Sequence, residues 1–160
     1  MQPIKIIDYK PEHQAHFERL NRAWIEKHFY IEESDKYVLT QPEEAIISKG
    51  GAILMALYNN EIAGTVGLKK VNKTVFEFTK MAVDETFQRK GIAEVLSYAS
   101  FEKAKELGAE RVILYSQTGL KPAITLYRKL GFKEVPLTEA GYERSDIKME
   151  IDLATIGITQ

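Results

Sequence analysis

The sequence has no cysteine, which excludes a disulfide framework, a zinc–thiolate site and a cysteine nucleophile. It also lacks an excess of charge of either sign, because its net charge is −1 at pH 7, so we expect neither nucleic acid nor an anionic membrane among its partners. No apolar run approaches the length of a membrane span, and the opening residues MQPIKIIDYKPEHQ hold none long enough for a signal peptide. The histidines His13, His16 and His28 form no metal-binding pattern, so no metal is expected. These absences favour a cytoplasmic enzyme or binding protein.

The composition that remains is that of an ordinary globular protein. Its 160 residues are enough for a substantial core, and its 44% hydrophobic and 28% charged content is typical of such proteins. No internal repeat or low-complexity linker divides the chain. We therefore expect one domain over residues 1–160, with its core at about residues 3–153.

The hydrophobic pattern predicts both strands and helices. Asn59-Asn60 is a turn signal that should join two strands as a hairpin, and a third strand follows. An antiparallel run followed by a strand–helix–strand unit predicts an α/β (α+β) fold, a mixed, mostly antiparallel twisted sheet of about seven strands with about four helices on both faces. The expected order is β-α-α-β-β-β-α-β-α-β-β, with strands near 4–8, 52–58, 61–70, 74–83, 111–116, 132–135 and 147–153 and helices starting near 11, 41, 91 and 122.

Residues 77–93, EFTKMAVDETFQRKGIA, resemble a strand, a polar turn and the start of a helix. A helix N-terminus exposes unpaired N–H groups and carries partial positive charge, which favours anions. Arg89 and Lys90 add full positive charges, and Gly91 leaves room for a close approach. The stretch therefore predicts a phosphate-binding turn. It is not a P-loop, because Lys90 precedes Gly91 and no Ser or Thr follows, and it is not a dinucleotide G-x-G-x-x-G motif.

Two motifs carry a resemblance to a known family. QRKGIA at 88–93 resembles the Q/R-x-x-G-x-G/A signature of the GNAT superfamily of acetyl-CoA-dependent N-acetyltransferases, and AITLYRKLGF at 123–132 resembles its A-x-x-L-Y-x-x-x-G-F segment. The resemblance covers about residues 3–153. It implies that acetyl-CoA is a co-substrate whose acetyl group moves to a primary amine by direct attack in a ternary complex. The lack of cysteine removes the most obvious covalent alternative.

The resemblance also implies where coenzyme A binds. In the family the strand before the main helix splays away from the strand after it, and the pantetheine arm fills the gap much as an added strand would. The splay often begins at a bulge, here expected near residues 80–82, and a backbone N–H beside it would hold the thioester oxygen. The implied cofactor-binding residues are Met81, Ala82 and Val83 for the pantetheine and thioester, and Gln88, Arg89, Lys90, Gly91, Ile92 and Ala93 for the pyrophosphate.

Two residues are implied in proton transfer. Tyr127 is the candidate general acid, because a phenol with its ordinary pKa of ~10 is protonated at neutral pH and can donate to the departing thiolate. Glu77, eleven residues before Gln88, is the candidate base, directly or through water, since some histone acetyltransferases of the family carry a catalytic glutamate there. Each residue also has a plainer interpretation: a core tyrosine on an apolar helix face, and an exposed strand residue between Phe76 and Phe78.

The sequence does not name the acceptor, which we expect to be a small-molecule or peptide amine. By resemblance, acceptor choice resides in the connection at 28–40 and in the segment 136–146. The acidic cluster formed by Glu32, Glu33 and Asp35 either meets a cationic substrate or is a solvated loop.

Two further features have no single interpretation. Leu120 stands where many family members have Asn, which puts a contact to the cofactor or to a bound water in doubt unless Lys121 replaces it. Tyr98 and Phe101 fall opposite the apolar stripe expected along residues 91–107, so they are either covered by neighbouring structure or form a homodimer contact.

The alternative function is a non-catalytic module of the same fold that binds or senses acyl-CoA. Both functions need the pyrophosphate site, and they differ in Tyr127 and in an open acceptor pocket. A nucleotide-binding regulator is a third interpretation, weakened because no base- or ribose-reading motif accompanies the phosphate-binding turn.

Overall fold

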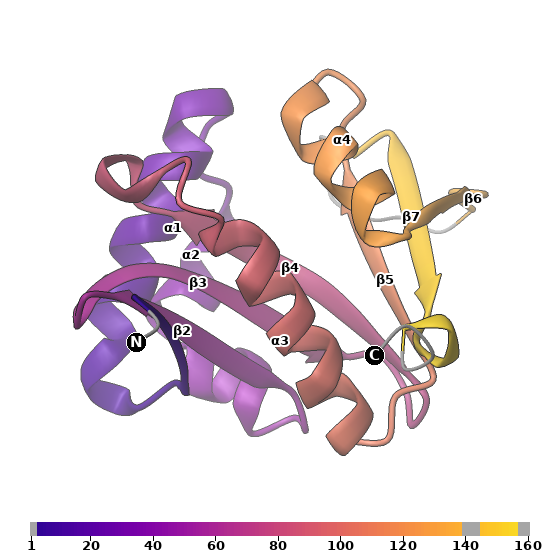
Figure 1. Cartoon of the computed structure of the whole chain (residues 1–160), viewed down its shortest axis with the longest axis horizontal. Helices are drawn as coiled ribbons and strands as arrows, with labels where there is room; N and C mark the ends of the chain where they lie inside the picture. Colours follow the sequence, from indigo (N-terminus) through magenta and orange to yellow (C-terminus); the bar gives the residue numbers. More distant parts are fainter. Residues whose placement is uncertain (1–2, 139–144, 157–160) are drawn as a thin grey trace.

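Seven strands form one mixed sheet in the computed structural model, which describes residues 3–138 and 145–156 (Figure 1). The strands lie in the order β1-β2-β3-β4-β5-β7-β6, and within this sheet only β4 and β5 pair in parallel. The predicted α/β fold with a mixed, mostly antiparallel sheet is confirmed. Its strands are β1 (Ile4–Asp8), β2 (Ala52–Tyr58), β3 (Glu61–Lys70), β4 (Val75–Val83), β5 (Arg111–Ser116), β6 (Lys133–Val135) and β7 (Ile147–Asp152), and its α-helices are α1 (Gln14–His28), α2 (Glu33–Thr40), α3 (Ile92–Glu106) and α4 (Lys121–Leu130). None of the helices in the described residues is long and apolar enough to cross a membrane.

Helices cover both faces of the sheet, as the side chains of β2 show, because alternate residues of this strand belong to two different apolar clusters. Leu54 and Ala56 join the apolar cluster beneath α3, whereas Ile53 and Met55 join the cluster formed with α1 and α2. Successive side chains of a strand point to opposite faces, so the two clusters lie on opposite sides of the sheet. Figure 1 shows the same arrangement, with α3 in front of the sheet and α1 behind it.

The hairpin between β2 and β3 forms at the predicted turn. Asn59 and Asn60 have φ values of 48° and 71°, and Tyr58 pairs with Glu61 across the turn. Positive φ at both central residues is what a two-residue type I′ turn requires, and asparagine adopts it more readily than most residues. The turn residues therefore set the pairing of β2 with β3 next to the turn, and the register shifts farther along, between Ala56 and Leu57.

Strands β4 and β5 separate soon after they meet, and this separation positions the site. Their parallel pairing joins only Val75–Glu77 to Arg111–Ile113, after which the two strands diverge. Further along β4, Lys80 has a φ of 55°, and the register against β3 shifts between the partners of Thr65 and Gly67. The bulge predicted near residues 80–82 is therefore confirmed.

The second helix begins earlier than the sequence suggested. It was expected from about residue 41, but α2 spans Glu33–Thr40, and the Thr40 hydroxyl donates to the Lys36 carbonyl in its last turn. Glu32 and Asp35 form a capping box that starts the helix within the segment taken as an acidic loop. The residues expected to begin the helix form a π-helical turn, Glu43–Ile47.

The buried face of α3 also differs from the prediction. Phe101, expected opposite the apolar stripe, is fully buried and packs against Phe78 and Phe132, whereas Leu107, expected within the stripe, is 39% exposed. The buried face includes two serines, Ser97 and Ser100, whose hydroxyls donate to backbone carbonyls of the same helix. Because these polar residues are satisfied internally, they occupy core positions that a hydrophobic pattern does not reveal.

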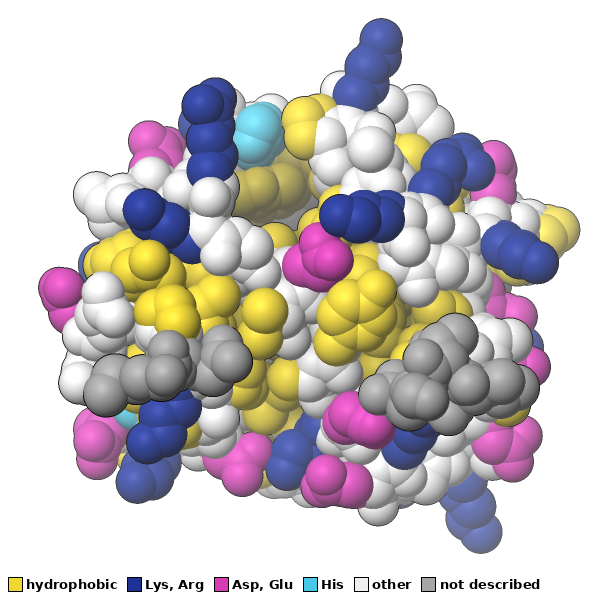
Figure 2. Space-filling model, in the orientation of Figure 1, with side chains coloured by type: hydrophobic (Ala, Val, Ile, Leu, Met, Phe, Trp, Pro, Cys, Tyr) yellow, Lys and Arg dark blue, Asp and Glu magenta, His cyan; other side chains and the backbone are white. Residues whose placement is uncertain are grey.

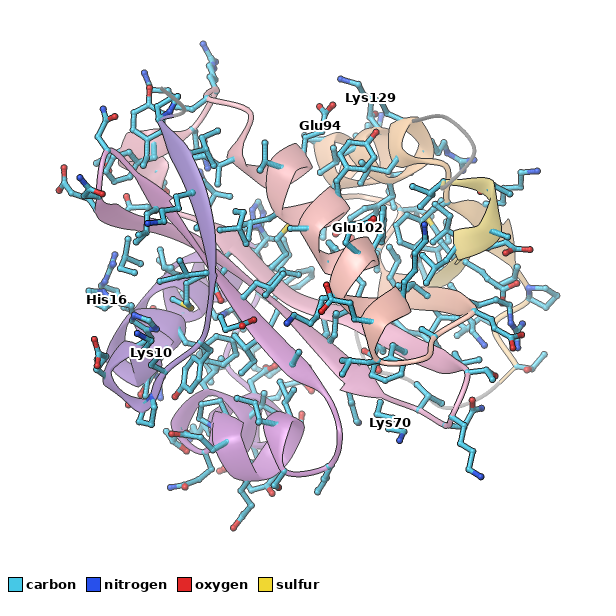
Figure 3. The ribbon with its side chains drawn as sticks, turned by 60° about the horizontal axis from the view of Figure 1, so that its bottom comes forward. Lys10, His16, Lys70, Glu94, Glu102 and Lys129 are labelled. Carbon is cyan, nitrogen blue, oxygen red and sulfur yellow. The ribbon has the colours of Figure 1, made fainter. Side chains whose placement is uncertain are left out.

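An ion pair joins the two helices on the α3 side of the sheet. The Lys129 ammonium of α4 lies 3.1 Å from the Glu94 carboxylate of α3, and Figure 3 shows these side chains next to each other. Both are partly exposed, so the pair links α4 to the start of α3 but contributes little stability.

Candidate active site

A cavity of about 330 Å³ lies where β4 and β5 diverge. In the view of Figure 2, the surface between the parts that carry α1 and α4 is hollowed, and the floor of the hollow is apolar. The described residues that line the cavity come from α1 and its C-cap, β4, the turn after it, β5, the start and middle of α4, and the end of the β6–β7 connection: Asn21, Trp24, Ile25, Phe29, Phe78, Thr79, Lys80, Met81, Ala82, Val83, Gln88, Ala93, Leu114, Tyr115, Ser116, Gln117, Leu120, Pro122, Ala123, Leu126, Tyr127 and Ser145.

The predicted cofactor-binding residues divide between this lining and the turn beside it. Met81, Ala82, Val83, Gln88 and Ala93 line the cavity. The turn between the last two holds the other predicted residues of the phosphate-binding motif. The side chains of Arg89 and Lys90 are exposed. Ile92 is buried in the core, so only the backbone of Ile92 is available to a ligand. The structure therefore brings the motif to the edge of the cavity.

The backbone of this turn has an unusual conformation. Arg89 and Gly91 both have positive φ, 64° and 82°, and α3 begins directly after Gly91 with no side chain capping its N–H groups. A Cβ placed on Gly91 would meet no atom within 4 Å, so the space beside the glycine is open. Uncapped N–H groups facing open space at a helix N-terminus are suited to an anionic group such as a phosphate. Nearby, the Lys90 ammonium lies 5.6 Å from the centre of the Tyr58 ring.

Tyr127 lines the cavity from α4. Its ring packs edge-on against Phe78 and Phe132, with centroid distances of 6.0 Å and 5.9 Å, as a core tyrosine would. Its hydroxyl has no hydrogen bond to any other described residue, and burial raises the pKa of Tyr127 to about 12. The site thus presents a neutral phenol whose proton is free to be donated to a ligand.

Glu77 lies at the point where the strands separate. It is the last residue of β4 that pairs with β5, opposite Ile113, and it is only 6% exposed, so its interpretation as an exposed strand residue is wrong. Phe76 and Phe78 belong to the cluster beneath α3, so by alternation the Glu77 side chain points to the α1 side of the sheet. Glu77 is adjacent to the lining residue Phe78 but is not among the described lining residues.

The acidic cluster does not form a wall of the cavity, because none of its residues is among the described lining residues. Glu33 is exposed and lies 3.5 Å from Lys36 on the same helix. Asp35 is fully buried and lies 3.1 Å from the Lys80 ammonium. In the other segment expected to choose the acceptor, residues 139–144 lie outside the described part of the chain.

The α1 wall is the part of the site that the sequence did not reveal. Trp24 and Ile25 had helical apolar spacing, which predicted only core packing, yet both line the cavity together with Asn21 and Phe29. A second cavity of about 450 Å³ adjoins the first at Trp24. No signal in the sequence separates these positions from ordinary core positions.

Two ion pairs connect α1 to the segment that follows β4. Arg19 lies 3.0 Å from Asp84, and Lys27 lies 3.4 Å from Glu85. All four residues line the second cavity. Leu120 lines both cavities, so the position where many family members have Asn faces the site, while Lys121 beside it is exposed.

Comparisons with known proteins agree with this geometry. The family model described as Acetyltransferase (GNAT) family matches residues 12–132. The uncharacterised N-acetyltransferase YvbK of Bacillus subtilis is 30% identical over 102 residues, which are 62% of this chain and 66% of that protein. The N-alpha-acetyltransferase of Saccharolobus solfataricus is 31% identical over 105 residues, which are 58% of this chain and 63% of that protein. The chain thus matches somewhat less than two thirds of the length of these relatives.

Solved structures extend the likeness of fold over nearly the whole chain. A GNAT-family acetyltransferase of Staphylococcus aureus Mu50 superposes with a TM-score of 0.83 at 21% identity, covering 94% of this chain and 99% of its own. The acetyltransferase yncA of Salmonella typhimurium, solved with acetyl-CoA, superposes with a TM-score of 0.74 at 14% identity, covering 95% of each chain. With the family model matching most of its length and the site motifs gathered at the divergence of β4 and β5, this chain belongs to the GNAT acetyltransferase family.

Proposed function

We propose that this protein transfers the acetyl group of acetyl-CoA to a primary amine by direct attack in a ternary complex. The observation that carries the proposal is the cavity between β4 and β5, which has an uncapped helix N-terminus at its edge and the unpartnered hydroxyl of Tyr127 in its wall. Family membership supports the reaction class, since relatives across the family are named N-acetyltransferases.

The residues at the divergence fit acetyl-CoA by shape and by hydrogen bonding. Beyond Glu77 the edge of β4 that faces β5 has no strand partner, which leaves backbone groups of residues 79–83 available to an extended pantetheine arm. The open space at Gly91 and the α3 N-terminus suit the pyrophosphate, with Arg89 and Lys90 adding positive charge. In this proposal the N–H of Met81 or Val83 holds the thioester oxygen as negative charge develops on it.

Acetyl-CoA supplies an acyl group bound to a good leaving group, the thiolate of coenzyme A. In this proposal, residues of the chain donate a proton to the thiolate and accept one from the amine. The neutral Tyr127 phenol donates to the thiolate as the carbon–sulfur bond breaks. Glu77, one residue from the lining, accepts the amine proton through water. Both transfers require the amine and the thioester to meet inside a cavity from which bulk water is largely excluded.

The acceptor side of the cavity is formed by α1. Trp24, Ile25 and Phe29 give it an apolar wall, and Asn21 and Thr79 add neutral polar groups. Such a wall suits the uncharged part of a small molecule or of a peptide next to its amine, because buried apolar contact supplies most of the affinity.

A screen that follows coenzyme A release with a thiol reagent tests the proposal over a panel of amines, including peptides with free N-termini. We expect release above the hydrolytic background with at least one class of amine, and loss of most of that release in Tyr127→Phe. Tight acetyl-CoA binding without turnover on any amine would instead support the sensing module, which needs the same phosphate site but no acid.

A further inference from the structure

A buried ion pair lies directly behind the cavity and has no place in the proposed chemistry. The Lys80 ammonium lies 3.1 Å from one carboxylate oxygen of Asp35, and the two side chains are 7% and 0% exposed. The other carboxylate oxygen accepts the Glu32 N–H at 3.0 Å, which begins α2. The pair therefore joins the N-terminus of α2 to the middle of β4.

Lys80 is also the residue at which β4 bulges. Its φ is 55°, a conformation that side-chain-bearing residues adopt rarely. The partners of β4 in β3 are Gly67 for Thr79 and Thr65 for Ala82, so Lys80 and Met81 together oppose a single residue. Such a bulge redirects the backbone groups that follow it. All residues from Thr79 to Val83 line the cavity, so the N–H groups that the bulge redirects are those proposed to hold the thioester.

A left-handed lysine persists only where its surroundings fix it, and here the side chain is anchored at its far end. Asp35 holds the ammonium on the α2 side of the sheet, and Lys80 is itself one of the residues that line the cavity. Because Asp35 contacts both the Lys80 ammonium and the Glu32 N–H, the ion pair couples the conformation of the bulge to the start of α2.

We propose that Asp35 and Lys80 are positioning residues for acetyl transfer, because the buried ion pair fixes the bulge that aims the β4 N–H groups at the thioester. This inference rests on the proposed function. An ion pair with a purely structural role would stabilise the fold but would not affect kcat. Measuring both stability and kcat therefore separates a structural role from a positioning role.

The test removes both charges together, in Lys80→Met/Asp35→Asn. Both replacements are close in volume, the asparagine oxygen can still accept the Glu32 N–H, and replacing a whole buried pair by neutral groups is often nearly neutral for stability. The matched control is Lys36→Met/Glu33→Gln, which removes an exposed pair from the same helix. For each protein we would measure kcat, the dissociation constant for acetyl-CoA and the melting temperature.

We expect kcat to fall between about tenfold and about a hundredfold in the double variant, the scale of a small misplacement of reacting groups. The dissociation constant for acetyl-CoA should stay within about threefold, because the pyrophosphate turn is untouched, and the control should match the wild type in every measurement. A wild-type kcat in the double variant would overturn the proposal, and so would a loss of kcat accompanied by equal losses of affinity and melting temperature.

Backbone amide shifts give a readout that does not depend on turnover. In the wild type, the amide resonances of Met81, Ala82 and Val83 should differ between the acetyl-CoA and coenzyme A complexes, and this difference should collapse in the double variant. If no amine is acetylated, the proposed function fails, and the positioning role is then judged by these shifts alone. A wild-type protein without the difference, or a double variant that retains it, would overturn the inference.

Discussion

Replacing Tyr127 by phenylalanine removes one oxygen from the cavity wall and leaves the ring in place. The ring keeps its edge-on contacts with Phe78 and Phe132, and the lost hydroxyl makes no hydrogen bond to another described residue. We therefore expect the free energy of unfolding at neutral pH to change by less than about 1 kcal/mol. Any large effect on turnover would then arise in the reaction rather than in the fold.

The size of the effect follows from the pKa. Burial raises the pKa of Tyr127 to about 12. An ordinary thiol has a pKa of about 8.5, so complete transfer of the phenolic proton to a thiolate is uphill by about 5 kcal/mol. The proton should therefore move from Tyr127 late in the reaction, and the rate effect should come from a hydrogen bond to sulfur that strengthens as negative charge grows on it. A hydrogen bond to a charged group is worth about 1.5–3 kcal/mol, so the variant should lose between about tenfold and about 10²-fold in kcat.

The assay is steady-state release of coenzyme A at saturating acetyl-CoA, with affinity measured separately by calorimetry. We expect kcat to fall while the dissociation constant for acetyl-CoA stays within about twofold, since the hydrogen bond belongs to the transition state. Full activity in Tyr127→Phe would mean that water or another group protonates the thiolate. Parallel loss of affinity and stability would make Tyr127 a structural residue.

Tyr127→Phe should also change how the free energy of unfolding depends on pH in alkaline solution. Burial raises the pKa of Tyr127 to about 12, so the folded state holds the phenolic proton more tightly than the unfolded state. The resulting stabilisation is complete below about pH 10 and disappears as the pH rises towards about 12. Tyr127→Phe should weaken this decline in denaturant titrations across that range. An unchanged decline would contradict the burial of the phenol.

Three further predictions concern the cofactor turn and the base. Acetyl-CoA should raise the melting temperature well above the shift given by NAD or ATP at the same concentration, and equal shifts would refute a specific site. Gly91→Glu should weaken acetyl-CoA binding at least about tenfold by charge repulsion, whereas Gly108→Glu should bind normally in calorimetry; it is a control with similar positive φ, where a Cβ would make only an ordinary contact with the Lys73 carbonyl oxygen at 3.7 Å. Glu77→Gln should lower kcat, and an unchanged kcat would assign the base to solvent.

The fold was predictable wherever local chemistry decides it. Asn59 and Asn60 carry the information for their hairpin within two residues, because few side chains accept the left-handed conformation that the turn needs. The π-helical turn and the early start of α2 were not predicted, since the capping box at Glu32 and Asp35 lay in a segment whose charge suggested a solvated loop. The buried face of α3 was not predicted at Ser97. A serine whose hydroxyl donates a hydrogen bond to a carbonyl of its own helix can be buried, yet a hydrophobic pattern assigns it to the surface.

The candidate site was predictable along the two motifs and along the end of β4, where Met81, Ala82 and Val83 line the cavity. The motif residue Gln88 and the candidate acid Tyr127 come together at one cavity, as the resemblance implied. Trp24 could not be identified, since a residue that lines a cavity from a helix has the same spacing as one that fills a core. The Lys80–Asp35 pair joins residues 45 positions apart, and its existence depends on how α2 lies against the sheet, which no local pattern records.

The short pairing between β4 and β5 affects how the protein unfolds. In the described residues, the strand pairing that joins the ladder of β1–β4 to the ladder of β5, β7 and β6 consists of three residue pairs, with two further backbone hydrogen bonds beside them, from the N–H groups of Glu110 and Arg111 to the Thr74 carbonyl. Side-chain contacts also connect the two halves, including the exposed Lys129–Glu94 contact between α4 and α3. Such a seam is where a fold separates into smaller cooperative units before it unfolds globally. A ligand that hydrogen-bonds to both edges would merge these units, so acetyl-CoA would raise the cooperativity of the fold as well as its stability.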